Sequence, residues 1–213
     1  MNRAEAISEY LLTGKAIAGR LEGLASLRLG IFQEYPYLYR GRREDELAYL
    51  AGYAEKPGAC VILAEEDGAV IGAATGMPLL HEDAALRAPF AETSYSLDAI
   101  YYIGELLFRS GYRNRGLGQR LLTRMENHIQ RLGSFSKITC ATVERPDDYP
   151  LRPGDDLPIS RFLARTGFAR LAGVTTHFAW LETDGVKRDH TMQFWMKELP
   201  GAESELPPAT ENG

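Results

Sequence analysis

The chain has 213 residues, of which 45 % are apolar and 10 % aromatic, values that are ordinary for a globular protein and sufficient for a sizeable core. Its net charge is −5, and three of its Glu lie in the tail Pro200 to Gly213, which has no Lys or Arg. The rest of the chain is therefore close to neutral, which argues against a nucleic-acid-binding surface. We expect one domain over residues 1–199, followed by an acidic, Pro-rich and disordered tail.

Membrane and secretion signals are not expected in this sequence. No apolar run is long enough to span a bilayer, and the first residues show neither the apolar segment nor the cleavage pattern of a signal peptide. We therefore expect a cytoplasmic protein. Cys60 and Cys140 lie in strand-like apolar runs, so we expect reduced core residues rather than a disulfide.

The first half of the chain predicts three strands and two helices. Apolar periodicity and turn residues place them as follows: a strand at Ser8–Thr13, helices at Ile17–Glu34 and Arg42–Glu55, and a hairpin of strands at Cys60–Glu65 and Ala69–Met77. The polar segment His81–Asp98 shows no period, and we expect an irregular loop there.

The second half predicts four more strands, one strongly amphipathic helix and one short helix. The elements are a strand at Ile100–Phe108, a helix at Gly116–Leu132, a strand at Lys137–Val143, a loop at Arg145–Pro158, a short helix that ends near Gly167, and two strands at Ala172–Thr183 and His190–Leu199. The apolar residues of the long helix share one face, so this helix is expected to pack on a sheet.

The junction between the strand at Ile100–Phe108 and the long helix has the composition of an anion site. Arg113, Gly116 and Gly118 precede or open the helix, whose first N–H groups have no partner within it. Glycine lets an anion approach the backbone, and arginine adds charge. A phosphate loop would need Lys and Ser or Thr after Gly118, and a dinucleotide fingerprint would need Gly or Ala at Leu121, so both alternatives fail.

The pattern Arg-x-x-Gly-x-Gly, placed after a strand and at the start of an amphipathic helix, resembles the pyrophosphate-binding motif of the GCN5-related N-acetyltransferase (GNAT) superfamily. The order of elements agrees with that resemblance over roughly Leu11 to Leu199. It implies an α/β (α+β) fold with a central mixed, mostly antiparallel sheet of six to seven strands flanked by helices. The fourth and fifth strands of such a sheet splay apart.

The resemblance implies acetyl-CoA or a related acyl-CoA as co-substrate. Its pyrophosphate would bind the backbone N–H groups of Arg113, Asn114, Arg115, Gly116, Leu117, Gly118, Gln119 and Arg120. Its pantetheine arm would lie along Leu106, Leu107 and Phe108 like an added strand, with the thioester where the strands splay.

Direct transfer to an amine needs a base, because an alkylamine with a pKa near 10.4 is neutral about once in a few thousand molecules at pH 7. Glu105, on the strand before the motif, is the candidate base; a structural Glu in a salt bridge is the alternative. The proton donor that many members place on the short helix is replaced here by Leu163. Tyr149, Tyr101, Tyr102 or solvent could take its place.

The acceptor amine, a small molecule or a protein, is not identified by the sequence. Asp147 and Asp148, in the loop after the strand at Lys137–Val143, are candidate contacts for a cationic amine, and a solvated loop is the alternative. The aromatic run Tyr35 to Tyr39 could line the acceptor pocket or pack the core. No His, Cys or carboxylate spacing predicts a metal site. A homodimer is an open question, and no nucleic acid or membrane partner is expected.

Three functions from different classes follow from these features. The first is an acyl-CoA-dependent N-acyltransferase. The second is a catalytically silent domain that binds acyl-CoA as a sensor, and the third is an unrelated nucleotide-binding protein. Turnover distinguishes the first from the second, and binding of CoA rather than ATP or NAD distinguishes both from the third.

Overall fold

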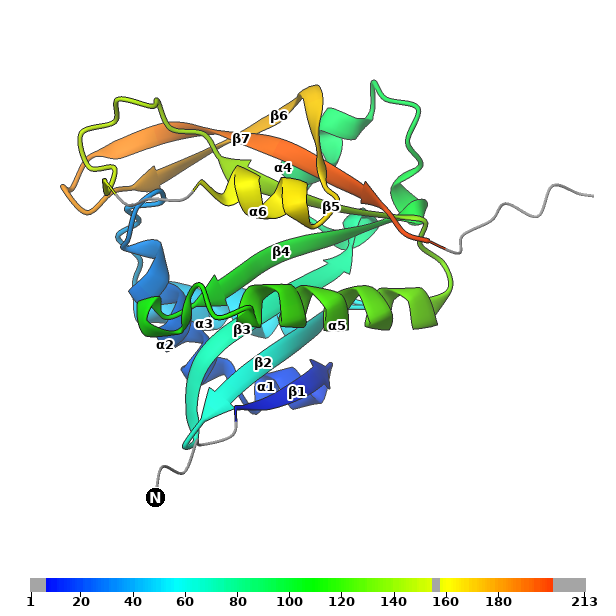
Figure 1. Cartoon of the computed structure of the whole chain (residues 1–213), viewed down its shortest axis with the longest axis horizontal. Helices are drawn as coiled ribbons and strands as arrows, with labels where there is room; N and C mark the ends of the chain where they lie inside the picture. Colours follow the sequence, from blue (N-terminus) through cyan, green and yellow to red (C-terminus); the bar gives the residue numbers. More distant parts are fainter. Residues whose placement is uncertain (1–6, 155–157, 201–213) are drawn as a thin grey trace, which may run out of the picture.

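The strands of the protein form one continuous sheet in the order β1-β2-β3-β4-β5-β7-β6 (Figure 1). The computed structural model describes residues 7–154 and 158–200, and within them the sheet has seven strands. Neighbouring strands are antiparallel except β4 and β5, which are parallel. This is the mixed, mostly antiparallel sheet that the resemblance implies. The expected disordered tail lies outside the described residues, apart from Pro200.

The strand bounds agree closely with the sequence prediction. The strands are β1 (Ser8–Thr13), β2 (Cys60–Glu66), β3 (Ala69–Pro78), β4 (Ile100–Phe108), β5 (Lys137–Val143), β6 (Ala169–Leu181) and β7 (Lys187–Glu198). The helices are α1 (Lys15–Ala18), α2 (Leu21–Phe32), α3 (Arg43–Ala54), α4 (Ala84–Arg87), α5 (Leu117–Leu132) and α6 (Ile159–Arg165).

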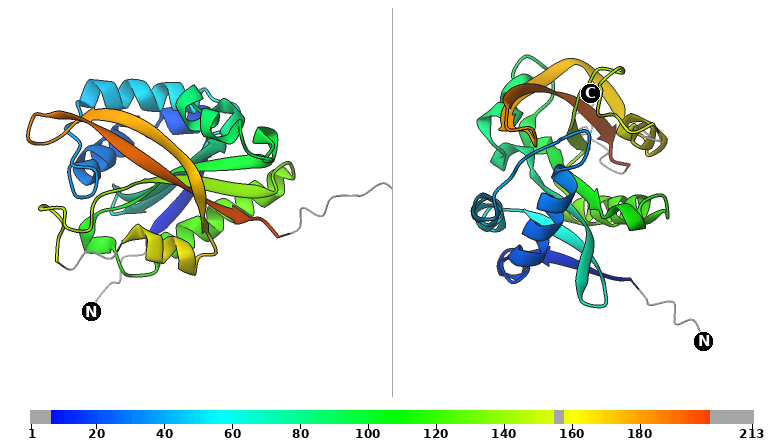
Figure 2. Two further views of the ribbon diagram at one scale, coloured as in Figure 1. Left: turned by 90° about the horizontal axis from the view of Figure 1, so that it is seen from above. Right: turned by 90° about the vertical axis from the view of Figure 1, so that its left-hand side faces the viewer.

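Helices cover both faces of the sheet, as the right-hand view of Figure 2 shows. Successive residues of a strand point to opposite faces, so β2 serves two cores at once. Cys60 and Ile62 pack in the core under α5, whereas Val61 and Leu63 pack against α1, α2 and α3. Both cysteines are buried and free, as predicted.

Two predictions of local structure are wrong. The helix expected over Ile17–Glu34 is broken between Ala18 and Leu21, because Arg20 has the non-helical angles φ −125° and ψ 9°. The segment His81–Asp98 is not an irregular loop throughout. A 3₁₀ turn at Leu79–His81 precedes α4. Two more 3₁₀ turns, Ala88–Phe90 and Leu97–Ala99, follow α4. The buried side chains of Leu86 and Phe90 fix these turns against the sheet, which a count of polar residues does not reveal.

The predicted splay lies between β4 and β5. The two strands pair only from Ile100 opposite Lys137 to Tyr102 opposite Thr139, and they then diverge (Figure 1). A β-bulge begins at the same point, because Gly104 is the extra residue of β4 between the pairs Ile103–Gly76 and Glu105–Thr75. Bulges bend a strand and redirect its side chains. The edge of β4 that faces β5 is therefore unpaired from Ile103 onward.

Candidate active site

The connection from β4 to α5 leaves a cluster of backbone N–H groups without partners. Asn114 (φ +60°) and Gly116 (φ +77°) adopt the left-handed conformation and turn the chain into the helix. The first N–H that pairs within the helix belongs to Arg120, which donates to the Gly116 carbonyl at 3.1 Å. Among the described residues, nothing accepts a hydrogen bond from the N–H groups of residues 114–119. Such an end of a helix binds anions.

The arginines of this connection have different environments. Arg113 donates through Nε to the Phe108 carbonyl at 2.9 Å and forms a 2.6 Å ion pair with Glu34, so it braces the loop. Arg120 is paired with Glu9. Arg115 is exposed and stacks over the ring of Tyr112 at 5.4 Å. In the part of the chain that the structure describes, Arg115 has no acidic partner, and its charge is the one left for a bound anion.

Gly118, in the first turn of α5, faces the side chains of Phe162 and Leu106. A Cβ atom there would meet the ring of Phe162 at 3.7 Å and the side chain of Leu106 at 3.8 Å, which are ordinary contact distances. The protein itself would therefore accommodate a methyl group at this position. The absence of a side chain matters instead for whatever approaches the N–H groups from outside.

The unpaired edge of β4 adjoins this loop. Leu106, Leu107 and Phe108 follow the bulge, and Leu107 and Phe108 are buried by their side chains on the two faces of the sheet. Their ladder on one side is formed with β3, while β5 has already diverged on the other. The Thr75 hydroxyl, buried and without a hydrogen-bond partner among the described residues, lies beneath the bulge at Gly104. An extended ligand that brings polar groups would fit here.

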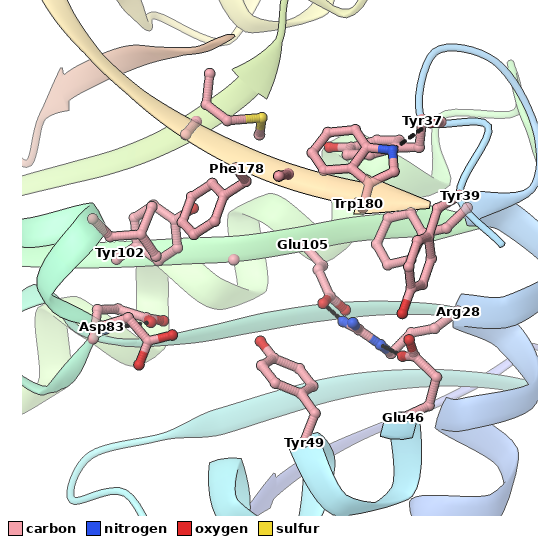
Figure 3. A pocket seen from close by; sticks show the side chains of 17 residues that line it. Arg28, Tyr37, Tyr39, Glu46, Tyr49, Asp83, Tyr102, Glu105, Phe178 and Trp180 are labelled. Carbon is pink, nitrogen blue, oxygen red and sulfur yellow. Dashed lines mark hydrogen bonds and ion pairs between the residues drawn. The ribbon is translucent and has the colours of Figure 1, made fainter. Parts of the chain in front are cut away.

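A cavity of about 340 Å³ borders the bulge of β4. Its lining includes Gly104 and Glu105 of β4 together with side chains from α2, α3, the segment after β3, and β6 (Figure 3). Seven aromatic side chains form most of its wall: Phe32, Tyr37, Tyr39, Tyr49, Tyr102, Phe178 and Trp180. Of the run Tyr35 to Tyr39, Tyr37 and Tyr39 thus line the cavity. The cavity is large enough for a small molecule.

Glu105 points into the cavity and is tied to Arg28 of α2. The Arg28 guanidinium forms ion pairs with Glu105 and with Glu46 of α3, and all three side chains are nearly buried. It also lies over the rings of Phe32 at 4.9 Å and Tyr49 at 4.4 Å. Figure 3 shows this guanidinium between the two carboxylates. Glu105 is therefore held in an ion pair rather than free within the cavity.

A second pair of carboxylates lines the other part of the cavity. Glu82 and Asp83 lie between the turn at Leu79–His81 and α4. Glu82 is half-buried, and burial raises its pKa from the ordinary value to about 6. Sequence analysis missed both residues, because His81–Asp98 offered only a polar stretch without a motif.

The tyrosines of the wall stay neutral at physiological pH. Burial raises the pKa of Tyr37 to about 12 and raises that of Tyr102 well above its usual range. The wall is held by a buried network: Trp180 donates to the Tyr37 carbonyl at 2.9 Å, and Arg145 donates to the Pro36 carbonyl at 2.8 Å. Arg145 is itself paired with Glu182 at 2.6 Å.

The other candidate residues lie outside the lining of the cavity. Tyr149 packs under the Arg145 guanidinium, 4.8 Å from its ring centre. Asp147 is exposed and paired with Arg152 at 2.9 Å, and Asp148 is exposed. Leu163 is buried in the core under α5 and α6, so no hydroxyl is supplied from that position.

Residues 7–154 and 158–200 contain no group of three or more His, Cys, Asp or Glu side chains arranged to hold a metal ion. No helix in those ranges has the length and apolarity needed to cross a membrane.

Comparison with known families identifies the class of protein. The sequence model of the Acetyltransferase (GNAT) family matches residues 25–149, which include β4, the loop and α5. Because this match covers more than half of the chain, the protein belongs to the GNAT acetyltransferase family. No curated protein sequence matches the chain significantly.

Solved structures share the fold at low sequence identity. YncA of Salmonella typhimurium, provisionally assigned as an acetyltransferase and determined with its cofactor acetyl-CoA, has a TM-score of 0.59 and 15% identity over 96% of this chain and 99% of its own. An acetyltransferase of the GNAT family from Staphylococcus aureus has a TM-score of 0.58 and 16% identity, over 91% and 99%. An aminoglycoside 6'-N-acetyltransferase complexed with coenzyme A has a TM-score of 0.56 and 14% identity, over 91% and 97%.

Proposed function

We propose that the protein transfers an acetyl group from acetyl-CoA, or another acyl group from an acyl-CoA, directly to a primary amine. One observation carries the proposal: the unpaired edge of β4, the unpaired N–H groups before α5 and the cavity meet at the splay that begins after Tyr102. The β4 edge and the N–H groups suit an extended, anionic acyl donor such as acetyl-CoA. The cavity suits a small acceptor amine. Family membership and the acetyl-CoA and CoA of the neighbouring structures support this assignment.

The residues of the loop would hold the donor. The N–H groups of residues 114–119 and the Arg115 guanidinium would bind the pyrophosphate, while Leu106, Leu107 and Phe108 would pair with the pantetheine arm. The thioester would then lie at the bulge, next to the cavity. A backbone N–H there would stabilise the charge that develops on the carbonyl oxygen.

The acceptor must lose a proton before or during attack. In the reaction the amine nitrogen forms a bond to the acyl carbon, the carbon–sulfur bond breaks, and its electron pair leaves on the CoA sulfur. We propose that Glu105 faces the amine as an ionised carboxylate and takes part in proton removal, directly or through water. Tyr149 stays a proposal as the proton donor to the leaving CoA sulfur, although its side chain does not line the cavity.

The test of this function has two parts. Calorimetric titration should show binding of CoA but not of ATP, with a rise in melting temperature that corresponds to about 2.7 kcal/mol at a hundredfold excess over Kd. An amine screen that follows release of the CoA thiol from acetyl-CoA should then find an acceptor. Binding of ATP without binding of CoA would overturn the proposal.

One observation favours a catalytically silent acyl-CoA sensor as the second candidate. The carboxylate nearest the bulge, Glu105, is already engaged in a nearly buried ion pair with Arg28, as a purely structural residue would be. Such a sensor would bind acetyl-CoA with the same loop but would release no thiol with any amine.

A further inference from the structure

The cavity has an imbalance of charge that the protein does not compensate. Among the described residues that line it are four carboxylates, Glu46, Glu82, Asp83 and Glu105, but only one cationic side chain, Arg28. Arg28 is fully engaged by Glu46 and Glu105. Glu82 and Asp83 therefore form a second acidic pole, and no cationic side chain of residues 7–154 or 158–200 forms an ion pair with either carboxylate.

The lack of a cationic partner has the largest consequence for Glu82. It is half-buried, and in the described chain its one hydrogen bond comes from the Asp83 backbone N–H at 3.3 Å. Lys56 acts on it from a distance, but no ion pair joins them. A partly desolvated carboxylate without a cation is unfavourable, so an arriving cation gains more here than at an exposed carboxylate.

The hydroxyl of Tyr102 is a second, independent polar group that a ligand in this cavity could contact. Tyr102 is 6% exposed, lines the cavity and is acted on electrostatically by Glu82. No described residue forms a hydrogen bond with its hydroxyl, and that oxygen is not enclosed by protein, so it is accessible to a ligand in the cavity. Figure 3 shows Tyr102 on the same side of the cavity as Asp83 and Phe178.

The protein already shows how this cavity stabilises a cation. At the first pole, Arg28 lies over the rings of Phe32 and Tyr49 and between two carboxylates. The second pole repeats the two components: aromatic rings, from Tyr102 and Phe178, and carboxylates, from Glu82 and Asp83. The ammonium group of a ligand would be held there by the same combination of charge and ring faces.

We propose that the acceptor is a cationic primary amine with a flat apolar body, and that Glu82 with the Tyr102 hydroxyl receives its ammonium group. This inference rests on the proposed function and specifies its acceptor. The aromatic wall from Tyr37 to Trp180 packs against the apolar body. Glu82 thus holds and orients the ammonium group. Once that group has lost one proton to Glu105, directly or through water as proposed above, its nitrogen lone pair is free to attack the thioester near Gly104, on the same strand as Tyr102.

The experiment measures binding of 2-phenylethylammonium and of its neutral counterpart 2-phenylethanol at pH 7.5. A Trp195→Phe background leaves Trp180 as the one tryptophan, and Trp180 lines the cavity, so its fluorescence reports occupancy. We expect the ammonium probe to bind at least tenfold more tightly than the alcohol. Glu82→Gln should weaken the ammonium probe at least tenfold and leave the alcohol unchanged, and Tyr102→Phe should weaken the ammonium probe severalfold.

Two controls make the result specific. Glu92→Gln removes an exposed carboxylate from the same segment outside the cavity lining and should change neither affinity. Glu82→Asp keeps the charge and should recover most of the binding that Glu82→Gln loses. Equal affinity of the two probes for the unmodified cavity would overturn the inference, as would an ammonium affinity unaffected by Glu82→Gln.

A CoA thermal shift on each variant separates the two proposals. Glu82→Gln should retain the shift that CoA gives the parent protein, because Glu82 lines the cavity and none of residues 113–120 does. Loss of ammonium binding with a normal CoA shift supports the inference. If CoA fails to bind the parent protein, the proposed function fails, whereas the fluorescence result still decides whether Glu82 receives the cation.

Discussion

Arg28 of α2 forms an ion pair with Glu105 of β4, and this contact joins the helical layer to the strand that borders the splay. The side chains are only 11% and 8% exposed, and Glu46 of α3 completes the cluster. Three separate elements thus meet at one guanidinium. A buried pair of this kind adds little net stability over an apolar replacement, but loss of one partner leaves an uncompensated charge.

Arg28→Gln should therefore destabilise the protein by about 3–5 kcal/mol, since it leaves two nearly buried carboxylates without their cation. Urea unfolding at pH 7 measures the loss. Arg42→Gln is the matched control, because Arg42 forms an exposed pair with Asp45 and its removal should cost about 0–1 kcal/mol. Similar losses for the two variants would mean that the cluster is not an electrostatic unit.

Glu105→Gln should lower kcat/KM by about 10² to 10⁴ at neutral pH and leave the affinity for CoA nearly unchanged. The rate should recover in part as pH rises, since neutral amine accumulates. Steady-state kinetics from pH 6 to 9 check this on any amine that the thiol-release screen identifies. An unchanged rate would assign Glu105 a purely structural role as the partner of Arg28.

Gly118→Asp should abolish CoA binding while the fold is retained. A Cβ at this position meets Phe162 and Leu106 at ordinary contact distances, so the variant should fold, but its carboxylate would repel a pyrophosphate at the helix N-terminus. Gly118→Ala, which adds the methyl group without the charge, should lose much less affinity. Calorimetric titration with CoA measures both, and circular dichroism verifies folding. A tight CoA complex of Gly118→Asp would show that the loop is not the pyrophosphate site.

Gly116→Asp should also abolish CoA binding, but at an additional cost to stability. Gly116 has φ +77°, a conformation that costs a residue with a Cβ roughly 1–2 kcal/mol. The combination of lost CoA binding and a lower melting temperature should therefore distinguish this variant from Gly118→Asp. Equal melting temperatures for the two would contradict the conformational assignment of Gly116.

The stability of the protein should depend on Glu82 between pH 4.5 and pH 7. Because burial raises its pKa from 4.5 to about 6, the folded state binds this proton more tightly than the unfolded chain does. Its contribution is fully present below about pH 4.5, is lost as pH rises to about 6, and amounts to about 2 kcal/mol. Tyr49, Tyr53 and Tyr102, which also face it, have raised pKa values and stay neutral.

Glu82→Gln removes this loss, so the variant should gain stability relative to wild type as pH rises from 4.5 to 7. Urea unfolding at both pH values gives the difference, and Glu92→Gln is the control. A stability difference that does not change with pH would mean that the carboxyl of Glu82 titrates normally.

Asp147→Asn together with Asp148→Asn should raise the KM for a cationic amine by no more than a few fold and leave acetyl-CoA binding intact. Both side chains are exposed and outside the cavity lining, and exposed charge contacts contribute up to about 1 kcal/mol. Added salt should remove the effect, because the Debye length is roughly 8 Å at physiological ionic strength. A large, salt-independent rise in KM would place this loop at the bound acceptor.

Local pattern predicted the strands and α5 well, for physical reasons. The bounds of β4 and β5 agree with the sequence prediction, because each is a short apolar run bounded by polar or turn residues. The break near Gly19 was missed, since the apolar period continues across it. The turns between Leu79 and Phe90 depend on burial of Leu86 and Phe90, which are separated by polar residues and so have no period of their own.

The two halves of the candidate site also differ in how far the sequence alone could predict them. The donor loop is contiguous from Leu106 to Arg120, so its spacing alone was informative. The cavity is built from distant segments: Arg28, Glu82 and Trp180 meet only through tertiary packing. In the sequence Arg28 was one polar residue in a Leu-rich helix, and Glu82 was one of several acids in an expected loop. The lining residues that the sequence indicated were Glu105 and Tyr102, on the strand before the motif, and Tyr37 and Tyr39, within a dense aromatic run.

The hydrogen bond from Trp180 to the Tyr37 carbonyl joins residues 143 positions apart. During synthesis the ribosome therefore releases every residue of the donor loop well before Phe178, Trp180 and Met192 close the remaining wall of the cavity. The wall of the cavity is therefore the last part of the candidate site that the growing chain can complete. A chain that stops after α6 would contain the donor loop but would lack this wall, so the C-terminal hairpin of β6 and β7 is needed to complete the candidate acceptor cavity.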